Sequence, residues 1–141
     1  NAVWRVAGQV AFPCATQNEL NAADARSLLD NGCIAVCEGA NMPCTAEAAD
    51  LFLKAKIAYA PGKAANAGGV ATSQLEMAQN ASMQRWTFKQ VDERLKDIML
   101  DIYQRTRDTA AELDRPTNLI LGANVAGFRR VADAMIQQGV V

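Results

Sequence analysis

Short apolar runs alternate with amphipathic stretches over the first part of the chain. The runs lie at Val10–Phe12, Ile34–Cys37 and Ile57–Ala60, and polar residues do not alternate within them. Runs of this kind are typical of strands buried on both faces of a parallel sheet. The stretches between them carry apolar residues at helical spacing, with Asn21 and Thr45 as candidate N-caps. This alternation predicts parallel βαβ units.

Helical periodicity dominates the second half of the chain. One helix is predicted from about Ala67 to about Arg85. A capping box at Thr87–Gln90 opens a long amphipathic helix with charged residues opposite its apolar stripe. The run Asp114–Thr117 interrupts this pattern, and a last helix is predicted from about Val125 to Gln138. We therefore expect an α/β fold of about three parallel strands followed by long C-terminal helices.

Charge and composition narrow the function classes. The 14 basic and 15 acidic residues are spread along the chain, which argues against a nucleic-acid or membrane surface. The chain contains no histidine, so it has no Ser-His or Cys-His nucleophile pair, and we expect no metal site. The four cysteines are expected to be free thiols. Without a signal-peptide pattern or a run of about 20 apolar residues, a cytoplasmic protein is expected.

Three loops leave the carboxyl ends of the predicted strands, and in a parallel sheet they share the edge where ligands bind. The loops are Pro13–Glu19, Glu38–Cys44 and Pro61–Gly69. They concentrate amide and small side chains, which suit a carboxamide and ribose hydroxyls such as those of a nicotinamide nucleotide. For any single loop, turn formation is the simpler explanation of these residues, but three such loops on one edge favour a ligand site.

Two further features refine this picture. No G-x-G-x-x-G follows a strand, so the chain resembles the second half of a Rossmann-like, doubly wound sheet, whose first half carries that fingerprint. Gly68 and Gly69 are expected to open a helix whose unpaired N–H groups favour an anionic group. Val70 and Ser73 share a face at this helix start, where a hydroxyl beside a small apolar surface could hold a carboxylate and its methylenes.

Several segments resemble the glutamate dehydrogenase family, specifically its bacterial hexameric, NADP-type members. They follow the family in order and cover nearly all of the chain after about Val10. The resemblance implies reversible oxidative deamination of L-glutamate to 2-oxoglutarate and ammonia, with NADP as cofactor and NAD not excluded. It also implies a homo-hexamer. The segments are AFPCATQNEL (Ala11–Leu20), EGANMP (Glu38–Pro43), KAANAGGVATSQLEMAQN (Lys63–Asn80), DIMLDI (Asp97–Ile102) and GANVAGFRRVADAMIQQGVV (Gly122–Val141).

The resemblance also assigns cofactor contacts. By analogy, Ala15 and Thr16 line the cofactor cleft, and Asn41 bonds the nicotinamide ribose region. Asn66 lies between the nicotinamide and the substrate. Lys63 is expected to be near the cofactor at best.

On the substrate side, Val70 and Ser73 match the residues that touch the glutamate side chain, with Ser73 at its distal carboxylate. Gln74 stands where glycine is common in the family, which affects the expected fine geometry of the substrate site. The family's catalytic lysine and aspartate belong to sequence N-terminal to this chain. No catalytic residue is therefore assigned here, and the chain is expected to be an inactive fragment on its own.

The resemblance divides the chain at residues 121 and 122. Residues 1–121 are expected to form the C-terminal half of the dinucleotide-binding domain with its following helices, and residues 122–141 a helix that returns to the substrate domain. In the fragment, the face with Phe128, Val131 and Met135 is expected to pack on the chain's own sheet or to mediate self-association. Two other functions stay open, namely a non-catalytic nucleotide-binding module and a dehydrogenase for another amino acid.

Overall fold

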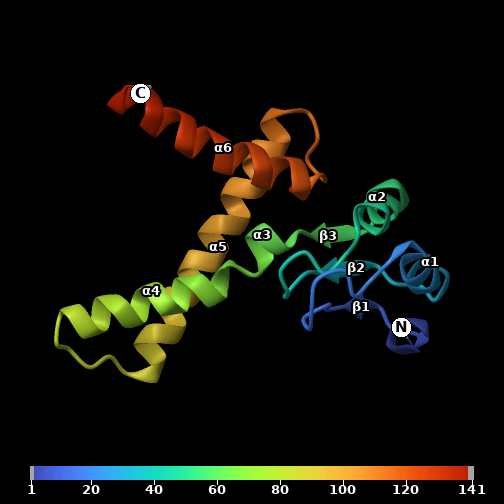
Figure 1. Ribbon diagram of the computed structural model, residues 1–141, viewed down its shortest axis with the longest axis horizontal. Helices are drawn as coiled ribbons and strands as arrows, with labels where there is room; N and C mark the ends of the chain where they lie inside the picture. Colours follow the sequence, from blue (N-terminus) through green and yellow to red (C-terminus); the bar gives the residue numbers. More distant parts are fainter. Residues whose placement is uncertain (1, 140–141) are drawn as a thin grey trace.

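A computed structural model describes residues 2–139, in which three parallel strands form a single sheet (Figure 1). The strand order is β1-β2-β3, and Ala11, Val36 and Tyr59 lie side by side across the sheet. The prediction of an α/β fold built from three parallel strands is confirmed. The elements are η1 (Ala2–Arg5), β1 (Val10–Ala11), α1 (Ala22–Asp30), β2 (Ala35–Cys37), α2 (Ala46–Ala55), β3 (Ala58–Ala60), α3 (Gly62–Ala65), α4 (Ala67–Ala81), α5 (Phe88–Glu112) and α6 (Leu119–Gln138).

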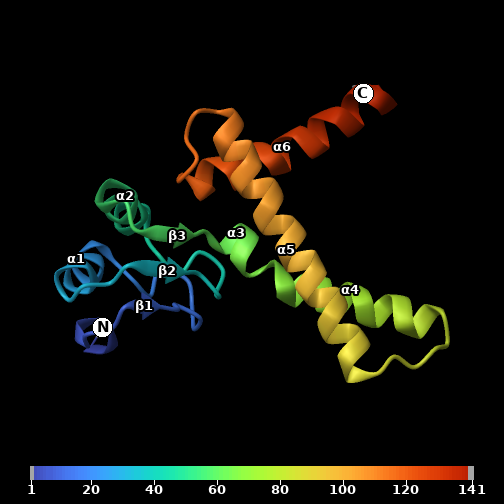
Figure 2. The same ribbon diagram turned by 180° about the vertical axis from the view of Figure 1, so that it is seen from behind.

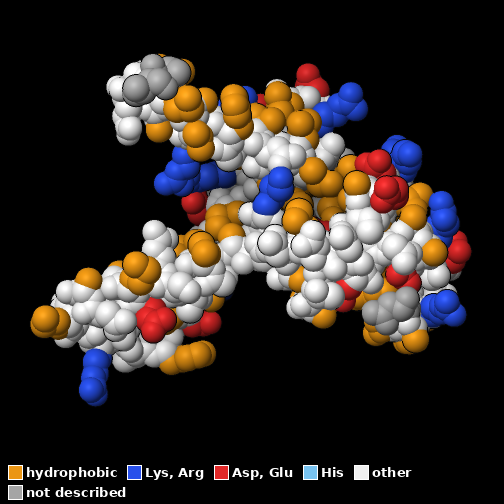
Figure 3. Space-filling model, viewed as in Figure 1, with side chains coloured by type: hydrophobic (Ala, Val, Ile, Leu, Met, Phe, Trp, Pro, Cys, Tyr) orange, Lys and Arg blue, Asp and Glu red, His pale blue; other side chains and the backbone are white. Residues whose placement is uncertain are grey.

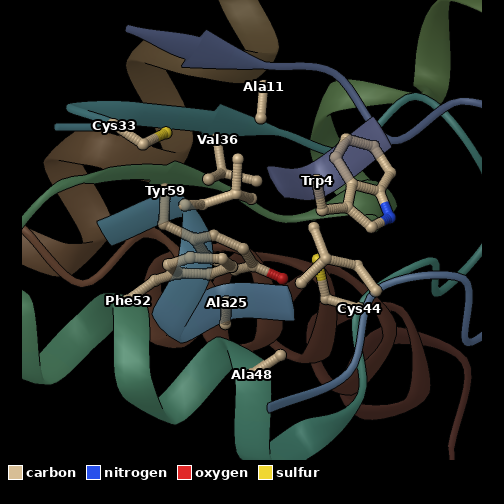
Figure 4. Close-up of a cluster of buried hydrophobic side chains, with 11 residues drawn as sticks. Trp4, Ala11, Ala25, Cys33, Val36, Cys44, Ala48, Phe52 and Tyr59 are labelled. Carbon is tan, nitrogen blue, oxygen red and sulfur yellow. The ribbon is translucent and has the colours of Figure 1, made fainter. Parts of the chain in front are cut away.

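The hydrophobic core lies between the sheet and helices α1 and α2 (Figure 4). Phe52 of α2 and Tyr59 of β3 stack with ring centroids 5.7 Å apart, and Val36 of β2 is buried beside them. Both helices begin where the sequence predicts. The Asn21 side chain accepts hydrogen bonds at the start of α1, and the Thr45 side chain does so at the start of α2. These local signals and the apolar faces position the two crossover helices.

The opposite face of the sheet is largely open. Val10 and Phe12, which flank the buried Ala11, are 48% and 63% exposed, and Ile34, just before β2, is 59% exposed. The interpretation of these runs as buried on both faces is therefore wrong for this chain. The reason is the path of the later helices, which cover this face only near the carboxyl ends of the strands. There α6 contacts β3, and α5 contacts α3.

Helices α4 and α5 form an antiparallel hairpin that projects away from the sheet (Figures 1 and 2). The Thr87 capping box is confirmed at the start of α5, with Gln90 as its reciprocal partner. Helix α4 ends at Ala81, before the predicted end near Arg85. Helix α6 begins at Leu119, earlier than the predicted Val125, because the Asn118 side chain caps it by accepting a hydrogen bond from Leu121 N.

Helix α6 crosses α5 and then leaves the body of the molecule as a projecting arm (Figures 1 and 3). The face with Phe128, Val131 and Met135 is exposed, so it does not pack on the chain's own sheet, and the other expected outcome, self-association, stays a prediction. The expected division between residues 121 and 122 falls inside α6, and the assignment of residues 122–141 to another domain stays a prediction. Residues 140 and 141 lie outside the described range.

The crossing of α5 and α6 depends on Gly122. A Cβ atom on Gly122 would lie 2.1 Å from the Thr106 carbonyl oxygen, which is closer than these atoms can approach, and it would also lie within a tight 3.1 Å of the Ala110 Cβ. Any larger residue must push the two helices apart. Gly127, in the same helix, has no such neighbour within 4 Å.

We therefore expect Gly122→Ala to destabilise the chain by about 1–3 kcal/mol in denaturant unfolding, since overpacking at a backbone contact cannot relax easily. Gly127→Ala is the matched control. It should be neutral or stabilising by about 0.5–1 kcal/mol, because alanine is the better helix former and meets open space. Equal effects of the two substitutions would contradict the assigned role of Gly122.

Candidate functional site

The three loops at the carboxyl ends of the strands are joined to one another, as the parallel topology predicts. Gly39 N donates to Pro13 O at 3.0 Å, which links the first two loops directly beyond their strands. Further along, Asn18 N donates to Met42 O at 3.0 Å and Leu20 N donates to Pro43 O at 3.0 Å. The edge is therefore one connected surface and not three independent loops.

Glu38, the first residue after β2, is the buried anion of this edge. Its side chain is only 5% exposed, and each carboxylate oxygen accepts a backbone hydrogen bond. Oε1 accepts from Cys44 N at 3.2 Å, and Oε2 accepts from Gly62 N at 2.6 Å. Because charge-assisted bonds are the strong ones, this carboxylate holds the second loop to the start of α3.

Two ionisable groups lie against this carboxylate. Burial, reinforced by hydrogen bonding to Glu38, raises the pKa of the Tyr59 hydroxyl above its ordinary value of 10.0. Burial and the same carboxylate raise the pKa of the Cys44 thiol above its ordinary value of 9.0. The hydroxyl of Tyr59 points toward Cys44 (Figure 4). Both groups are therefore neutral at physiological pH and serve as donors within a polar cluster under the edge.

Of the two asparagines assigned to the cofactor, Asn41 belongs to the second loop and Asn66 is hydrogen-bonded to it. Asn66 links α3 to α4, and its Nδ2 donates to Ala40 O at 3.1 Å, which leaves Oδ1 as the acceptor of that amide. Asn41 follows Ala40 and is exposed at the middle of the loop. It lines a cavity of about 430 Å³ together with Asn18, Glu38 and Lys63.

The first loop carries Ala15 and Thr16, both of which are exposed. Their backbone N–H groups donate to Glu19 Oε1 at 2.8 and 3.3 Å, so an acidic side chain within the same loop closes the turn. The side chains of the two residues are the parts left to face a ligand.

Val70 and Ser73 share a face in the first turns of α4, as their spacing predicts. Val70 is 75% exposed, and Ser73 is exposed with its Oγ donating back to Gly69 O at 3.4 Å. This long back-bond is weak, so the hydroxyl can be turned toward a ligand.

Gly68 and Gly69 lie in the first turn of α4, as expected, but the expectation of a free N–H group is wrong for Gly69. The short helix α3 precedes α4 almost without a break, and Gly69 N donates to Asn66 O at 3.2 Å. The start of the helical segment is instead the start of α3, where Glu38 already accepts the Gly62 N–H. An anion-binding helix terminus is therefore occupied from within the chain.

Lys63 lies on α3 beside the second loop, and its Nζ donates to Asn124 Oδ1 of α6. The lysine thus joins the edge to the last helix, and it also lines the cavity that contains Asn41.

The four cysteines are free, and among residues 2–139 there is no group of three His, Cys, Asp or Glu side chains placed to hold a metal ion. In the same range, no helix is both long and apolar enough to cross a bilayer.

The sequence places Glu38 at the ligand edge but does not reveal its two backbone partners. Gly62 lies 24 residues away, so the bond depends on strand pairing and not on local sequence. The sequence feature that could have indicated these bonds is an acidic residue directly after a buried parallel strand. A carboxylate at that position is removed from water and therefore needs hydrogen-bond donors.

Alkaline pH should weaken the fold through this cluster. In the unfolded chain, Cys44 loses its proton above about pH 9.0 and Tyr59 above about pH 10.0, whereas both stay protonated in the folded state. The free energy of unfolding therefore decreases as the pH rises above these values. Each group contributes a slope of about −1.4 kcal/mol per pH unit in the free energy of unfolding. Tyr59→Phe keeps the ring stacked on Phe52 and should flatten this slope above pH 10.0, measured by denaturant unfolding. An unchanged slope would contradict the prediction.

Comparisons with known proteins identify the family. A sequence profile of the Glutamate/Leucine/Phenylalanine/Valine dehydrogenases matches residues 1–139. The chain is 61% identical over 140 residues to the NADP-specific glutamate dehydrogenase of Helicobacter pylori strain J99, which covers 99% of this chain and 31% of that protein. It is 52% identical over 138 residues to the NAD-specific glutamate dehydrogenase of Bacteroides fragilis, covering 98% of this chain and 31% of that protein.

The fold agrees with the sequence relatives. The crystal structure of Plasmodium falciparum glutamate dehydrogenase superposes with a TM-score of 0.94 at 49% identity, over 98% of this chain and 30% of that one. The chain thus spans about 31% of the length of the curated relatives it matches. Over this span, sequence and fold agree that the chain belongs to the Glutamate/Leucine/Phenylalanine/Valine dehydrogenase family.

Proposed function

We propose that this chain supplies the wall facing nicotinamide and glutamate in an NADP-dependent glutamate dehydrogenase. The reaction is the reversible oxidative deamination of L-glutamate to 2-oxoglutarate and ammonia. The observation that carries the proposal is the 61% identity to an NADP-specific glutamate dehydrogenase across 99% of the chain. The acid–base groups of the reaction belong to other parts of the full protein, because the described edge offers no histidine and holds its buried carboxylate in backbone hydrogen bonds.

The donor set of the edge fits the nicotinamide half of a dinucleotide. Asn41 and Asn66 bring amides, which donate and accept at once, and Thr16 adds a hydroxyl. These are the groups that match a carboxamide and ribose hydroxyls. The bound cofactor supplies hydride exchange with the carbon that carries the amino group. The residues of this chain orient the ring and the ribose and exclude water from one side.

On the substrate side, we propose that Ser73 bonds the distal carboxylate of glutamate and that Val70 packs against its methylenes. The support is their shared exposed face on α4, one turn beyond Asn66. Asn66 then lies between the substrate and the nicotinamide. We also propose that the full protein is a cytoplasmic homo-hexamer, and that residues 122–141 return to the substrate domain. The exposed apolar face with Phe128 and Val131 supports this return.

Two questions of specificity stay within the proposal. NADP is favoured by the Helicobacter pylori relative, and the NAD-specific name of the Bacteroides fragilis relative keeps NAD as an alternative. A dehydrogenase for another amino acid is the second candidate, since the matching family includes leucine, phenylalanine and valine enzymes. Ser73 separates these substrates, because only glutamate offers it a charged carboxylate.

The isolated 141-residue chain should show no turnover of glutamate with NADP above background, since it lacks the acid–base groups of the reaction. NADPH formation measured by absorbance tests this, with the full-length enzyme as the positive control. Measurable turnover by the isolated chain would refute the assignment of those groups to other sequence. An inactive full-length enzyme would refute the proposed function itself.

In the full-length enzyme, Ser73→Ala should lower kcat/KM for glutamate relative to norvaline by about 10- to 150-fold, which corresponds to about 1.5–3 kcal/mol for a hydrogen bond to a charged group. Thr72→Ala is the matched control. It removes a neighbouring hydroxyl that also bonds back along α4, to Gly68 O at 2.8 Å, but on another face of the helix. A specificity ratio that does not change in Ser73→Ala would exclude the carboxylate contact.

A further inference from the structure

Glu38 is a buried ionisable group for which the proposed chemistry has no use. A carboxylate that is 5% exposed is costly unless donors surround it, and here backbone N–H groups from two different segments do so. One donor belongs to the end of its own loop and the other to the start of α3. The question is what this arrangement holds in place.

The first bond closes the loop that carries Asn41. Glu38 and Cys44 stand at the two ends of that loop, and the bond from Cys44 N to Oε1 joins those ends across it. Thr45, the next residue, caps α2, so the closed loop is anchored to a helix of the core. Asn41, at the middle of the loop, is positioned by this closure.

The second bond positions Asn66. Gly62 N donates to Glu38 Oε2 at 2.6 Å, and Asn66 N donates to Gly62 O at 2.8 Å across the single turn of α3. The side chain of Asn66 in turn bonds the second loop, because its Nδ2 donates to Ala40 O at 3.1 Å. The three bonds form a closed circuit, so a displacement at Glu38 moves both asparagines.

We propose that Glu38 is a positioning residue that sets the separation of Asn41 and Asn66 and thereby the pose of the nicotinamide nucleotide. The role rests on the proposed function, and Glu38 is assigned no contact of its own with cofactor or substrate, because both of its carboxylate oxygens are bonded within the chain. It acts through its two backbone donors on Asn41 and Asn66, which are proposed to contact the cofactor. Since a misplacement of about 1 Å can lower a rate by about 100-fold, loosening this circuit should affect catalysis as well as binding.

The substrate side of the edge is held by packing of α4 on α5, which does not involve Glu38. Gly68, in the first turn of α4, packs against α5, where its Cβ position lies 3.4 Å from Met99 Sδ and 3.6 Å from Leu95 Cδ1. Val70 and Ser73 belong to this packed part of α4. A change at Glu38 should therefore disturb the cofactor side more than the glutamate side.

The test is steady-state kinetics of the full-length enzyme carrying Glu38→Gln, which keeps the shape of the side chain and removes its charge. We expect the KM for NADP to rise about ten-fold and kcat to fall, while the KM for glutamate rises by a smaller factor than the KM for NADP. The matched control is Glu47→Gln in the exposed first turn of α2, which should leave all constants unchanged. Glu38→Asp, which keeps the charge but shortens its reach, should show a smaller rise in the same constant.

The outcomes separate the possible roles. If Glu38 only stabilises the fold, the melting temperature and the active fraction fall together and the KM for NADP stays as in the wild type, which overturns the proposal. Loss of the folded protein in both Glu38 variants overturns it as well. If the wild-type enzyme does not turn over glutamate with NADP, the proposed function fails first, independently of Glu38.

Discussion

The buried carboxylate of Glu38 is the constraint on which the ligand edge of this protein depends. A charge removed from water costs several kcal/mol unless its oxygens find donors, and Gly62 N and Cys44 N provide them here. Satisfying one carboxylate therefore requires the second loop and the start of α3 to meet at one point. The hydrophobic core below, with Phe52 stacked on Tyr59, brings these segments close enough to do so.

Much of the fold follows from local sequence, because its signals act within a few residues. Asn21, Thr45 and Thr87 cap their helices as predicted, and the short apolar runs become parallel strands. The errors occur where distant packing decides. Phe12 is exposed because none of the helices in residues 2–139 covers it, and position 122 within α6 must be glycine because the Thr106 carbonyl of α5 leaves no room for a Cβ atom.

The candidate site, too, could be predicted from the sequence only in part. Parallel topology alone predicts that Asn41 and Asn66 approach one edge, since loops after parallel strands emerge on the same side. The bonds that orient them could not be predicted, because they join residues that are far apart in sequence. The expected free helix start at Gly69 failed for a related reason. The Gly69 N–H is bonded by Asn66 O, at the junction of the single turn of α3 with α4, and such short helices leave little periodicity to detect.

The same short helix connects the ligand edge to the rest of the molecule. Gly62 is held by Glu38, and the next residue, Lys63, bonds Asn124 of α6. Helix α6 is in turn locked on α5 by the close approach of Gly122 to Thr106. Two adjacent residues of one four-residue helix thus bond the ligand edge on one side and α6 on the other, because α3 lies between β3 and the long helices.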